Sequence, residues 1–496
     1  MRRREFVHHS VTLGAAAMSW GLLPPMPARA AGRDVIEVTL EGRPYRYPAA
    51  TGADFTGLAY NGRSPGPLLR VRHGQTFRAR YRNRTGGPST IHWHGMILPN
   101  DMDGVPGVTQ PPIPDGGEFT YTFKPGPPGF RWYHSHVEPQ SALGLFGAFV
   151  VEDPSEPRAD VEVVLVLHDV PDMRSFRAAV AGRSTAPVDV PQGVRAMHSM
   201  PRMSRMPGLS TMGTPAMAHP MPMGDEVEYL AHCVSGAAYP HTRPIIVNVG
   251  QTVRLRILNA SPTLTHYLRL AGHRLRVTHS DGNRLARAVT VDALRIGVAE
   301  RYDAWFEVAR PGAWLLQSLM ADAHDQRQSV LIRTADAAHL APETPAPSLG
   351  GAVMFTYALA GVGTPEPHVP EPSGLADVRA NLLLGGGSGG PHWTIDGRIW
   401  PHTPKIRVRR GERVLIHFTN PTAMDHPMHL HGHVFELVGI NGERLTYPLP
   451  KDTALVPAGG SATWRFVADS PPGRWLLHCH NAVHMVDGMA TEVDYL

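Results

Sequence analysis

The feature that most constrains this chain is a pattern that occurs three times along its 496 residues. In each copy a Gly precedes an Asn by nine residues, at Gly74 and Asn83, Gly250 and Asn259, and Gly411 and Asn420. Apolar residues alternate with polar ones between them, which is the period of a half-buried β-strand. We expect the arginines of these strands to face solvent. A Pro-Gly pair closely followed by Trp comes later in every copy, at 128–132, 311–314 and 472–475.

The repeats predict three β-rich domains built on one plan. The 50 glycines and 48 prolines suit many short strands and turns better than long helices. We place the domains at residues 33–154, 155–340 and 376–496. The proline-rich segment 341–375 between the second and third domains is interpreted as a linker.

Residues 1–30 have the features of an export signal. Arg3-Arg4-Glu5-Phe6-Val7 is similar to the twin-arginine pattern, an apolar stretch runs from Val11 to Leu23, and Ala28-Arg29-Ala30 resembles a small-x-small cleavage site. The apolar stretch is shorter than the ~20 residues needed to span a membrane, so we expect no stable membrane anchor. The sequence therefore predicts export, to the periplasm or an equivalent compartment.

The charge of the chain is small once this signal is set aside. The net charge is +4, from 47 Lys and Arg against 43 Asp and Glu. Arg2, Arg3, Arg4 and Arg29 outnumber Glu5 in the signal, so almost all of the positive excess lies there. A nearly neutral body argues against a nucleic-acid partner.

Histidines in His-x-His pairs mark the first and third domains at matching offsets. The pairs are His92 and His94, His134 and His136, His429 and His431, and His478 and His480. At those offsets the second domain has Leu268-Arg269-Leu270 and Gln317-Ser318-Leu319. Residues i and i+2 of a strand point to the same face, so each pair presents two imidazoles side by side. Eight imidazoles in this pattern predict a cluster of several metal ions.

Cys479 stands between two of these histidines, and its side chain must point away from theirs. It then meets His484, Met489 and His426, a set of two imidazoles, one thiolate and a weak thioether. That set is typical of a blue-copper electron-transfer site. The other cysteine, Cys233, has no partner motif, and we expect a buried thiol without a disulfide.

These motifs resemble those of the multicopper oxidases. The resemblance covers essentially the whole chain after the signal and implies an all-β fold of three cupredoxin-like Greek-key β-barrel domains. It also implies four copper ions per chain. His426, Cys479, His484 and Met489 would hold type 1 copper, and His92 and His429 would hold type 2 copper. The type 3 pair would be held by His94, His134, His136, His431, His478 and His480.

Reduction of O2 to two waters needs four electrons and four protons, so a proton relay is expected beside the cluster. Asp103 resembles the acidic residue of the family at that place, although Asp103-Gly104 could equally form only a turn. Many family members have a glutamate directly after the type 1 histidine, where this chain has Met485. Asp487 is a weak substitute for a second relay.

The reducing substrate is suggested by a methionine-rich segment, residues 197–223, in the second domain. Thioethers suit Cu(I), so we interpret the segment as a copper-collecting or substrate-gating loop like those of bacterial copper-resistance oxidases. The alternative, an apolar helix stripe, conflicts with the prolines at 201, 207, 215, 220 and 222. We predict a monomeric Cu(I) oxidase with possible activity on phenolic or aromatic reductants. A laccase-type phenol oxidase, a copper nitrite reductase and a non-catalytic copper-binding relative are the alternatives.

Overall fold

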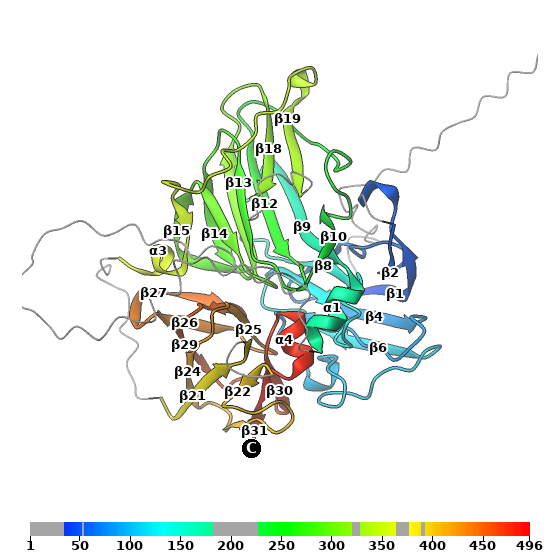
Figure 1. The fold of residues 1–496 in the computed structure, drawn as a ribbon, viewed down its shortest axis with the longest axis vertical. Helices are drawn as coiled ribbons and strands as arrows, with labels where there is room; N and C mark the ends of the chain where they lie inside the picture. Colours follow the sequence, from blue (N-terminus) through cyan, green and yellow to red (C-terminus); the bar gives the residue numbers. More distant parts are fainter. Residues whose placement is uncertain (1–33, 52–53, 182–226, 320–327, 364–375, 388–391) are drawn as a thin grey trace, which may run out of the picture.

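The computed structural model describes residues 34–51, 54–181, 227–319, 328–363, 376–387 and 392–496 (Figure 1). The predicted export signal, residues 1–30, and the methionine-rich segment, residues 197–223, lie outside these ranges. So does the last third of the predicted linker, residues 364–375.

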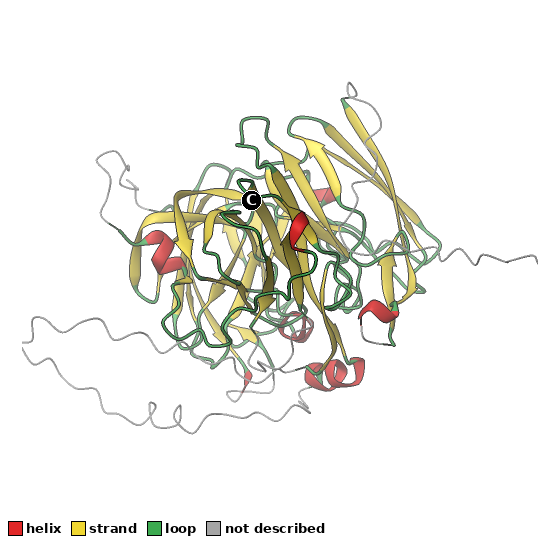
Figure 2. Cartoon of the chain, turned by 90° about the horizontal axis from the view of Figure 1, so that it is seen from above, coloured by secondary structure: helices red, strands yellow, loops and turns green. Residues whose placement is uncertain are grey.

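Strands dominate the described chain and form six sheets, two in each of three domains (Figures 1 and 2). The first domain contains β1 (Val35–Arg46), β2 (Thr56–Tyr60), β4 (Thr76–Asn83) and β6 (Glu118–Phe123) in one sheet and β3 (Leu69–Arg72), β5 (His92–His94), β7 (Gly129–His134) and β8 (Phe146–Glu152) in the other. The second contains β9 (Val161–Pro171), β10 (Tyr229–Val234), β12 (Thr252–Asn259), β14 (Leu275–Ser280), β15 (Asn283–Val291) and β17 (Arg301–Glu307), facing β11 (Ile245–Val247), β13 (His266–Leu270), β16 (Ala293–Ile296), β18 (Ala313–Ser318), β19 (Ser329–Thr334) and β20 (Met354–Phe355). The third contains β21 (Val378–Gly385), β22 (Thr394–Ile395), β24 (Arg413–Thr419), β26 (Phe435–Ile440), β27 (Glu443–Lys451) and β29 (Ser461–Val467), facing β23 (Ile406–Val408), β25 (His426–Leu430), β28 (Thr453–Val456), β30 (Arg474–Cys479) and β31 (Ala490–Tyr495). The predicted all-β class is confirmed.

The repeated strand has the same neighbours in every domain. β4, β12 and β24 each pair in parallel with the first strand of their domain, β1, β9 and β21. Each pairs on its other side with an antiparallel strand, β6, β17 and β29. The sequence repeat is therefore a repeat of topology, and matching positions in the three domains can be compared by strand register.

The arginines of the repeated strands face solvent only in part. Arg78 and Arg80 on β4 are exposed, as expected. Arg254 and Arg256 on β12 are buried, which corrects the prediction for the second domain. Both guanidinium groups contact the buried carboxylate of Asp303 on β17, Arg254 through Nη2 at 2.6 Å and Arg256 through Nη1 at 3.0 Å. A guanidinium with a hydrogen-bonded carboxylate partner can be covered, whereas an unpaired one cannot.

The described part of the predicted linker, residues 341–363, contains a strand and a helix. Met354 and Phe355 form β20, which pairs in parallel with β16 of the second domain. Helix α3 (Tyr357–Gly361) follows and packs against β15 and against β27 of the third domain. The Tyr357 hydroxyl donates to Glu300 at 2.6 Å and accepts from the backbone N–H of Leu455 at 2.9 Å. This stretch therefore joins the second domain to the third.

Two other short helices meet at the domain junction. Helix α1 (Met173–Val180) follows β9 and packs against α4 (Ala482–Asp487) of the third domain (Figure 1). The remaining helical turns are the 3-10 segments η1 (Ala49–Thr51), η2 (Asn100–Met102) and η3 (Ala335–Ala337). Among the described residues there is no helix with the length and apolarity that a membrane crossing requires.

Candidate metal centre

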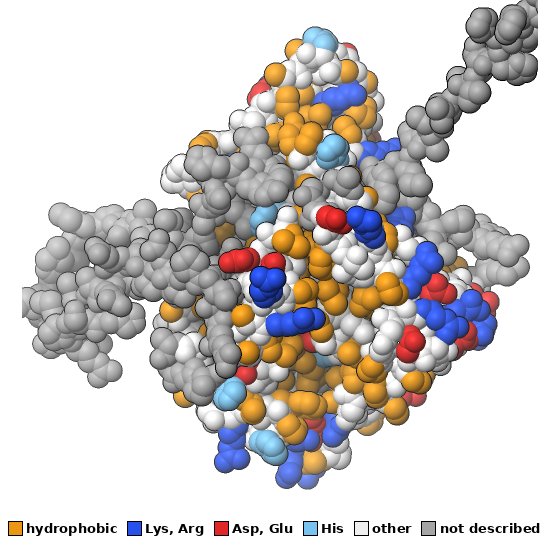
Figure 3. All heavy atoms as spheres, turned by 45° about the vertical axis from the view of Figure 1, so that its right-hand side comes forward, with side chains coloured by type: hydrophobic (Ala, Val, Ile, Leu, Met, Phe, Trp, Pro, Cys, Tyr) orange, Lys and Arg blue, Asp and Glu red, His pale blue; other side chains and the backbone are white. Residues whose placement is uncertain are grey.

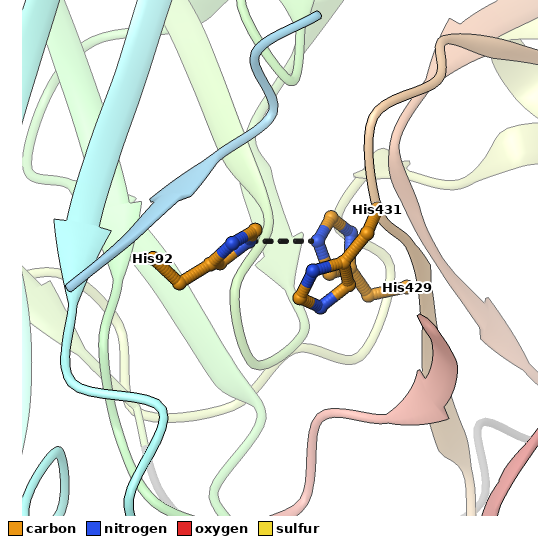
Figure 4. Close-up of side chains that lie close together, drawn as sticks. All are labelled: His92, His429 and His431. Atoms are coloured by element: carbon orange, nitrogen blue, oxygen red, sulfur yellow. Dashed lines mark hydrogen bonds between the residues drawn. The ribbon is translucent and has the colours of Figure 1, made fainter. Parts of the chain in front are cut away.

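The four His-x-His pairs lie together between the first and third domains. In the first domain β5 carries one pair, and the other consists of His134 at the end of β7 and His136 two residues later. In the third domain β25 and β30, each with the residue that follows it, carry the pairs. Figure 4 shows His92 of β5 facing His429 and His431 across the domain boundary. The Nε2 atoms of His92 and His429 are 3.4 Å apart, and those of His431 and His478 are 3.1 Å apart. All eight imidazoles that the sequence predicts as one cluster converge on this junction.

Burial in the protein keeps seven of these eight imidazoles neutral. Burial, reinforced by neighbouring imidazoles, lowers the pKa of six of them well below the usual 6.5; these are His94, His134, His136, His429, His431 and His480. Burial lowers the pKa of His478 to about 4. A neutral imidazole has one N–H and one lone-pair nitrogen, and a metal binds the lone pair. The site therefore offers lone pairs and not positive charges.

Hydrogen bonds decide which nitrogen carries the lone pair. Nδ1 lies 2.8–2.9 Å from a carbonyl or carboxylate oxygen in five of the histidines: His92, His134, His429, His431 and His478. An oxygen there accepts a hydrogen bond from Nδ1–H, so the lone pair on Nε2 is left for a metal. His94 is reversed, because its Nε2 lies 3.1 Å from Asp452 Oδ1 and 3.0 Å from Thr453 Oγ1.

The ring nitrogens that form no hydrogen bond show whether this site suits a copper ion. His94 Nδ1, His134 Nε2, His136 Nε2 and His480 Nε2 are buried without a hydrogen-bond partner. Buried polar atoms are normally satisfied, so a cluster of unsatisfied ring nitrogens indicates a missing ligand. Imidazole nitrogen is a preferred ligand of copper, and the donor set therefore fits copper ions at this junction.

A second group of possible metal ligands lies next to the histidine cluster and consists of His426, Cys479, His484 and Met489, which we call the blue-copper group. Cys479 Sγ is 3.4 Å from His484 Nδ1 and 3.8 Å from His426 Nδ1, and the two Nδ1 atoms are 3.0 Å apart. Met489 is fully buried, and its carbonyl accepts the backbone N–H of Cys479 at 3.0 Å. Trp393 packs over His484 with ring centroids 3.9 Å apart. The structure thus brings together all four residues predicted for a blue-copper site.

Local capping places His484 in this group. The side chain of Asn481 accepts the N–H groups of Val483 and His484, which begins α4, and Gly488 ends the helix with a φ of +112°. A Cβ at Gly488 would lie 2.7 Å from Ile399, so glycine is needed there for space as well as for backbone conformation. One helical turn with Asn at its start and Gly at its end therefore fixes the distance between Cys479 and His484.

Comparison with known proteins decides the family. Models described as multicopper oxidase match residues 46–156, 226–338 and 378–495. The chain is 34% identical to the multicopper oxidase MmcO of Mycobacterium tuberculosis, across 97% of this chain and 92% of that protein. This chain belongs to the multicopper oxidase family. It is an oxidoreductase that uses O2, with copper as its metal and three cupredoxin-like domains.

More distant relatives carry two kinds of name. The chain is 27% identical to a copper resistance protein A homolog of Pseudomonas syringae, across 89% of this chain and 90% of that protein. It is 28% identical to laccase-4 of Thanatephorus cucumeris, across 85% of this chain and 82% of that protein. Among solved structures, the laccase of Botrytis aclada matches 93% of this chain and 88% of its own, with a TM-score of 0.72 and 22% identity. That structure supports the fold of this multicopper oxidase.

Asp103 lies against the histidine cluster of this multicopper oxidase. Its side chain is fully buried, Oδ2 accepts from His431 Nδ1 at 2.9 Å, and its carbonyl accepts from His92 Nδ1 at 2.9 Å. It also stands at a turn, because Gly104 has a φ of +85° and a Cβ there would meet the carbonyl of Ile91. The turn and the contact with two cluster histidines therefore occur together.

Met485, which follows His484, is not an acidic residue and lies in apolar surroundings. Met485 packs in an apolar group with Val105, Leu476 and Ala490. Asp487 instead accepts from the backbone N–H of Trp393 at 2.5 Å and pairs with His392 at 2.8 Å. Asp487 is therefore engaged at the edge of the blue-copper group.

Strand register reveals matching copies of the blue-copper position in the other two domains. Ser135 and Ser318 stand where Cys479 stands, and their N–H groups donate to the carbonyls of Leu145 and Gln328 as Cys479 donates to Met489. In the second domain His266 occupies the position of His426, since His266 pairs with Ile296 as His426 pairs with Val456. Both ring nitrogens of His266 are hydrogen-bonded, to Ser318 Oγ and to Asp169, so this copy offers no lone pair to a metal.

This register also corrects the sequence comparison of the domains. Leu268 pairs with Ser318 as Met428 pairs with Cys479, so Arg269 matches His429 where the Gly-to-Asn spacing predicted Leu268. The span from Asn259 to Arg269 is one residue longer than the span from Asn420 to His429, and this offset hid His266. The sequence prediction also missed Asp452, Thr453 and Arg301, which surround His94. For Asp452 and Thr453 the sequence signal was the polar run Lys451-Asp452-Thr453 within an apolar region.

The lowered pKa values predict an acid-sensitive copper-free protein. Burial lowers the pKa of His168, His433 and His478 from 6.5 to about 4. The unfolded chain therefore binds more protons between these values, and the free energy of unfolding must fall as the pH drops from about 6.5 towards 4. Thermal melts of copper-free protein at a series of pH values measure this fall.

Copper-loaded protein is the control for this experiment, because a metal bound only to the folded state raises the melting temperature. A melting temperature of copper-free protein that stays constant across this pH range would contradict the prediction.

Proposed function

We propose that this chain couples one-electron oxidation of a reducing substrate to the four-electron reduction of O2 to two waters. The main support for this proposal is that Cys479 belongs to the blue-copper group, while both of its neighbours, His478 and His480, belong to the histidine cluster. In this proposal His426, Cys479, His484 and Met489 hold type 1 copper. His92 and His429 hold type 2 copper, and the remaining six histidines of the cluster hold the type 3 pair, four copper ions in all.

Bound copper would supply the one-electron redox chemistry at both groups. The chain's own residues position and shield the metals. The backbone through His478-Cys479-His480 links the two groups covalently, and the buried imidazoles exclude bulk water from the cluster. Asp103 Oδ2 holds a proton at His431 Nδ1, so its carboxylate is placed to pass protons towards the cluster.

The non-catalytic alternative predicts the loss of copper ligands. This chain retains all ten histidines and Cys479, and the described structure gathers them into two groups. A copper nitrite reductase would leave most of the His-x-His pairs without a role. The oxidase proposal accounts for every one of them.

The substrate proposal depends on the methionine-rich segment, residues 197–223. The described chain stops at Ala181, at the end of α1, and resumes at Val227. Since α1 packs against α4, which carries His484, the described chain that precedes the segment ends after a helix beside the proposed type 1 site. We propose Cu(I) as a substrate and a role in copper tolerance, in line with the relatives named copper resistance protein A. Oxidation of phenols is the second candidate, favoured by the relatives named laccase.

We further propose that the protein is exported by the twin-arginine route and acts as a monomer without nucleic-acid partners. The sequence of residues 1–30 supports export. On the face drawn in Figure 3, positive and negative side chains are interspersed around apolar ones, which is unlike the basic stripe of a nucleic-acid-binding surface.

Replacement of the thiolate tests the electron path. Cys479→Ser should abolish the blue absorption and the oxidation of reducing substrates, because serine does not replace the thiolate ligand of type 1 copper. Cys233→Ser is the matched control, since Cys233 is also fully buried but belongs to the second domain. Absorption spectra and oxygen consumption of both variants provide the measurement. Turnover retained by Cys479→Ser would contradict the proposed path.

Removal of the carboxylate beside the cluster tests the proton relay. Asp103→Asn should lower the kcat of oxygen reduction about 100-fold, the usual contribution of a positioned acid or base, while the blue absorption stays unchanged. Asp101→Asn is the control, because Asp101 is exposed in the same segment. Equal kcat values for Asp103→Asn and the parent protein would contradict the proton relay and leave Asp103 with only its role in the turn.

Replacement of the eight methionines of 197–223 by leucine tests the substrate. Their loss should reduce kcat/KM for Cu(I) by about tenfold, since a tethered soft-ligand segment raises the local substrate concentration. Oxidation of a phenol by the same variant is the internal control and should stay unchanged. Unchanged Cu(I) oxidation would favour the laccase-type alternative.

A further inference from the structure

The second domain provides none of the predicted copper ligands, yet one of its side chains reaches the copper cluster through a single intermediate. Arg301, at the start of β17, is fully buried at the point where the three domains meet. Its Nη1 and Nη2 donate to Asp452 Oδ1 and Oδ2 at 2.7 Å and 2.6 Å. Asp452 Oδ1 is in turn the atom that faces His94 Nε2.

All the donors of this guanidinium have acceptors. Besides the two bonds to Asp452 in the third domain, Nε donates to the carbonyl of Phe130 in the first domain at 3.2 Å. Nη1 and Nη2 also donate to the carbonyls of Ala299 and Asp281 in the second domain, at 3.2 Å and 3.1 Å. Five N–H groups meet five acceptors from three domains, and only the planar fork of arginine can provide that set.

Asp452 uses this anchoring to fix two histidines. Its carboxylate accepts from His94 Nε2, and its carbonyl accepts from His429 Nδ1 at 2.8 Å. The two imidazole rings stack with centroids 3.7 Å apart and an interplanar angle of 13°. The bond to Nε2 leaves the lone pair of His94 on Nδ1, the buried atom without a partner. If the Asp452 side chain rotated, it would no longer hold the proton of His94 on Nε2 or fix the orientation of the His94 ring.

The backbone around His94 is shaped to admit this contact. Gly95 has a φ of +78°, and a Cβ there would lie 2.4 Å from Asp452 Oδ2 and 2.6 Å from Arg301 Nη2. The residue after His94 must therefore be glycine for the Arg301–Asp452 pair to approach so closely.

We propose that Arg301 is a positioning residue for the trinuclear copper centre, acting through Asp452 on His94 and His429. The inference rests on the proposed assignment of these two histidines as copper ligands. In this view the second domain, although it binds no metal in the cluster, sets the geometry of the copper site between the other two.

The test is Arg301→Lys, which keeps the positive charge but loses the fork. The copper ions of the trinuclear centre should be removed by a chelator at about 10–100-fold lower concentration, the usual effect of losing an outer-shell partner. Electron paramagnetic resonance should show a changed type 2 signal, while the blue absorption of type 1 copper stays at the parent intensity. Arg254→Lys is the matched control, because Arg254 is also a buried arginine paired with a buried aspartate, Asp303, without a contact to a cluster histidine.

Thr453→Val provides a second variant that leaves the ion pair intact. Thr453 Oγ1 donates to Asp452 Oδ1 at 3.0 Å and lies 3.0 Å from His94 Nε2, so its loss should weaken copper retention by about fivefold. Parent-like copper retention and spectra in both variants would overturn the proposal. If the parent protein itself binds no copper in the cluster, the proposed function fails instead, and metal analysis of the parent separates these two outcomes.

Discussion

The convergence of eight imidazoles at one domain junction is the constraint on which the rest of this structure depends. Packing ring nitrogens as close as 3.1 Å to 3.4 Å would be strongly unfavourable if the rings were protonated. Burial lowers the pKa of His429, His431 and His478, which keeps these three rings neutral. Each ring must also present its lone pair inward, which requires an acceptor on its other nitrogen. Asp103, Asp452 and several backbone carbonyls supply these acceptors. The residues around the domain junction therefore serve to hold the imidazoles in fixed orientations.

The sequence predicted the parts of the site that depend on local spacing. The period of two along a strand placed both histidines of each pair on one face, and the alternation of Cys479 with His478 and His480 placed the thiolate on the other. These inferences need only the geometry of one strand, and the repeated pattern supplied the domains. Arg301 and Asp452 could not be found in this way, since they lie about 150 residues apart and act on His94, which is more than 350 residues from Asp452. Partners of this kind become visible only when the tertiary structure is known.

The errors of prediction also have physical causes. Arg254 and Arg256 follow the same alternation as the exposed arginines of β4, but Asp303 on the neighbouring strand neutralises them and allows burial. The match of Leu268 to His429 was wrong because the span from Asn259 to Arg269 is one residue longer than the span from Asn420 to His429. Strand pairing, and not spacing along the chain, determines which residues of two domains are equivalent. Pattern alone does not report what a neighbouring strand contributes. It therefore predicts a strand's direction and faces better than it predicts the partners of its polar side chains.

The three copies of the blue-copper position show how few residues separate a metal site from an ordinary polar interior. The second domain keeps a histidine at the position of His426, yet Ser318 replaces the thiolate and Asp169 binds the second ring nitrogen. The first domain has Ser135 at the same position, hydrogen-bonded to Gln140. Hydrogen bonds that satisfy every donor and acceptor leave nothing for a metal, whereas the third domain leaves its thiolate and imidazoles facing one another. The second domain instead contributes a buried arginine, Arg301, that holds the carboxylate of Asp452 in the third domain. In the proposed assignment a common fold is divided into two domains that hold the copper ligands and one whose buried Arg301 orients two of those ligands through Asp452.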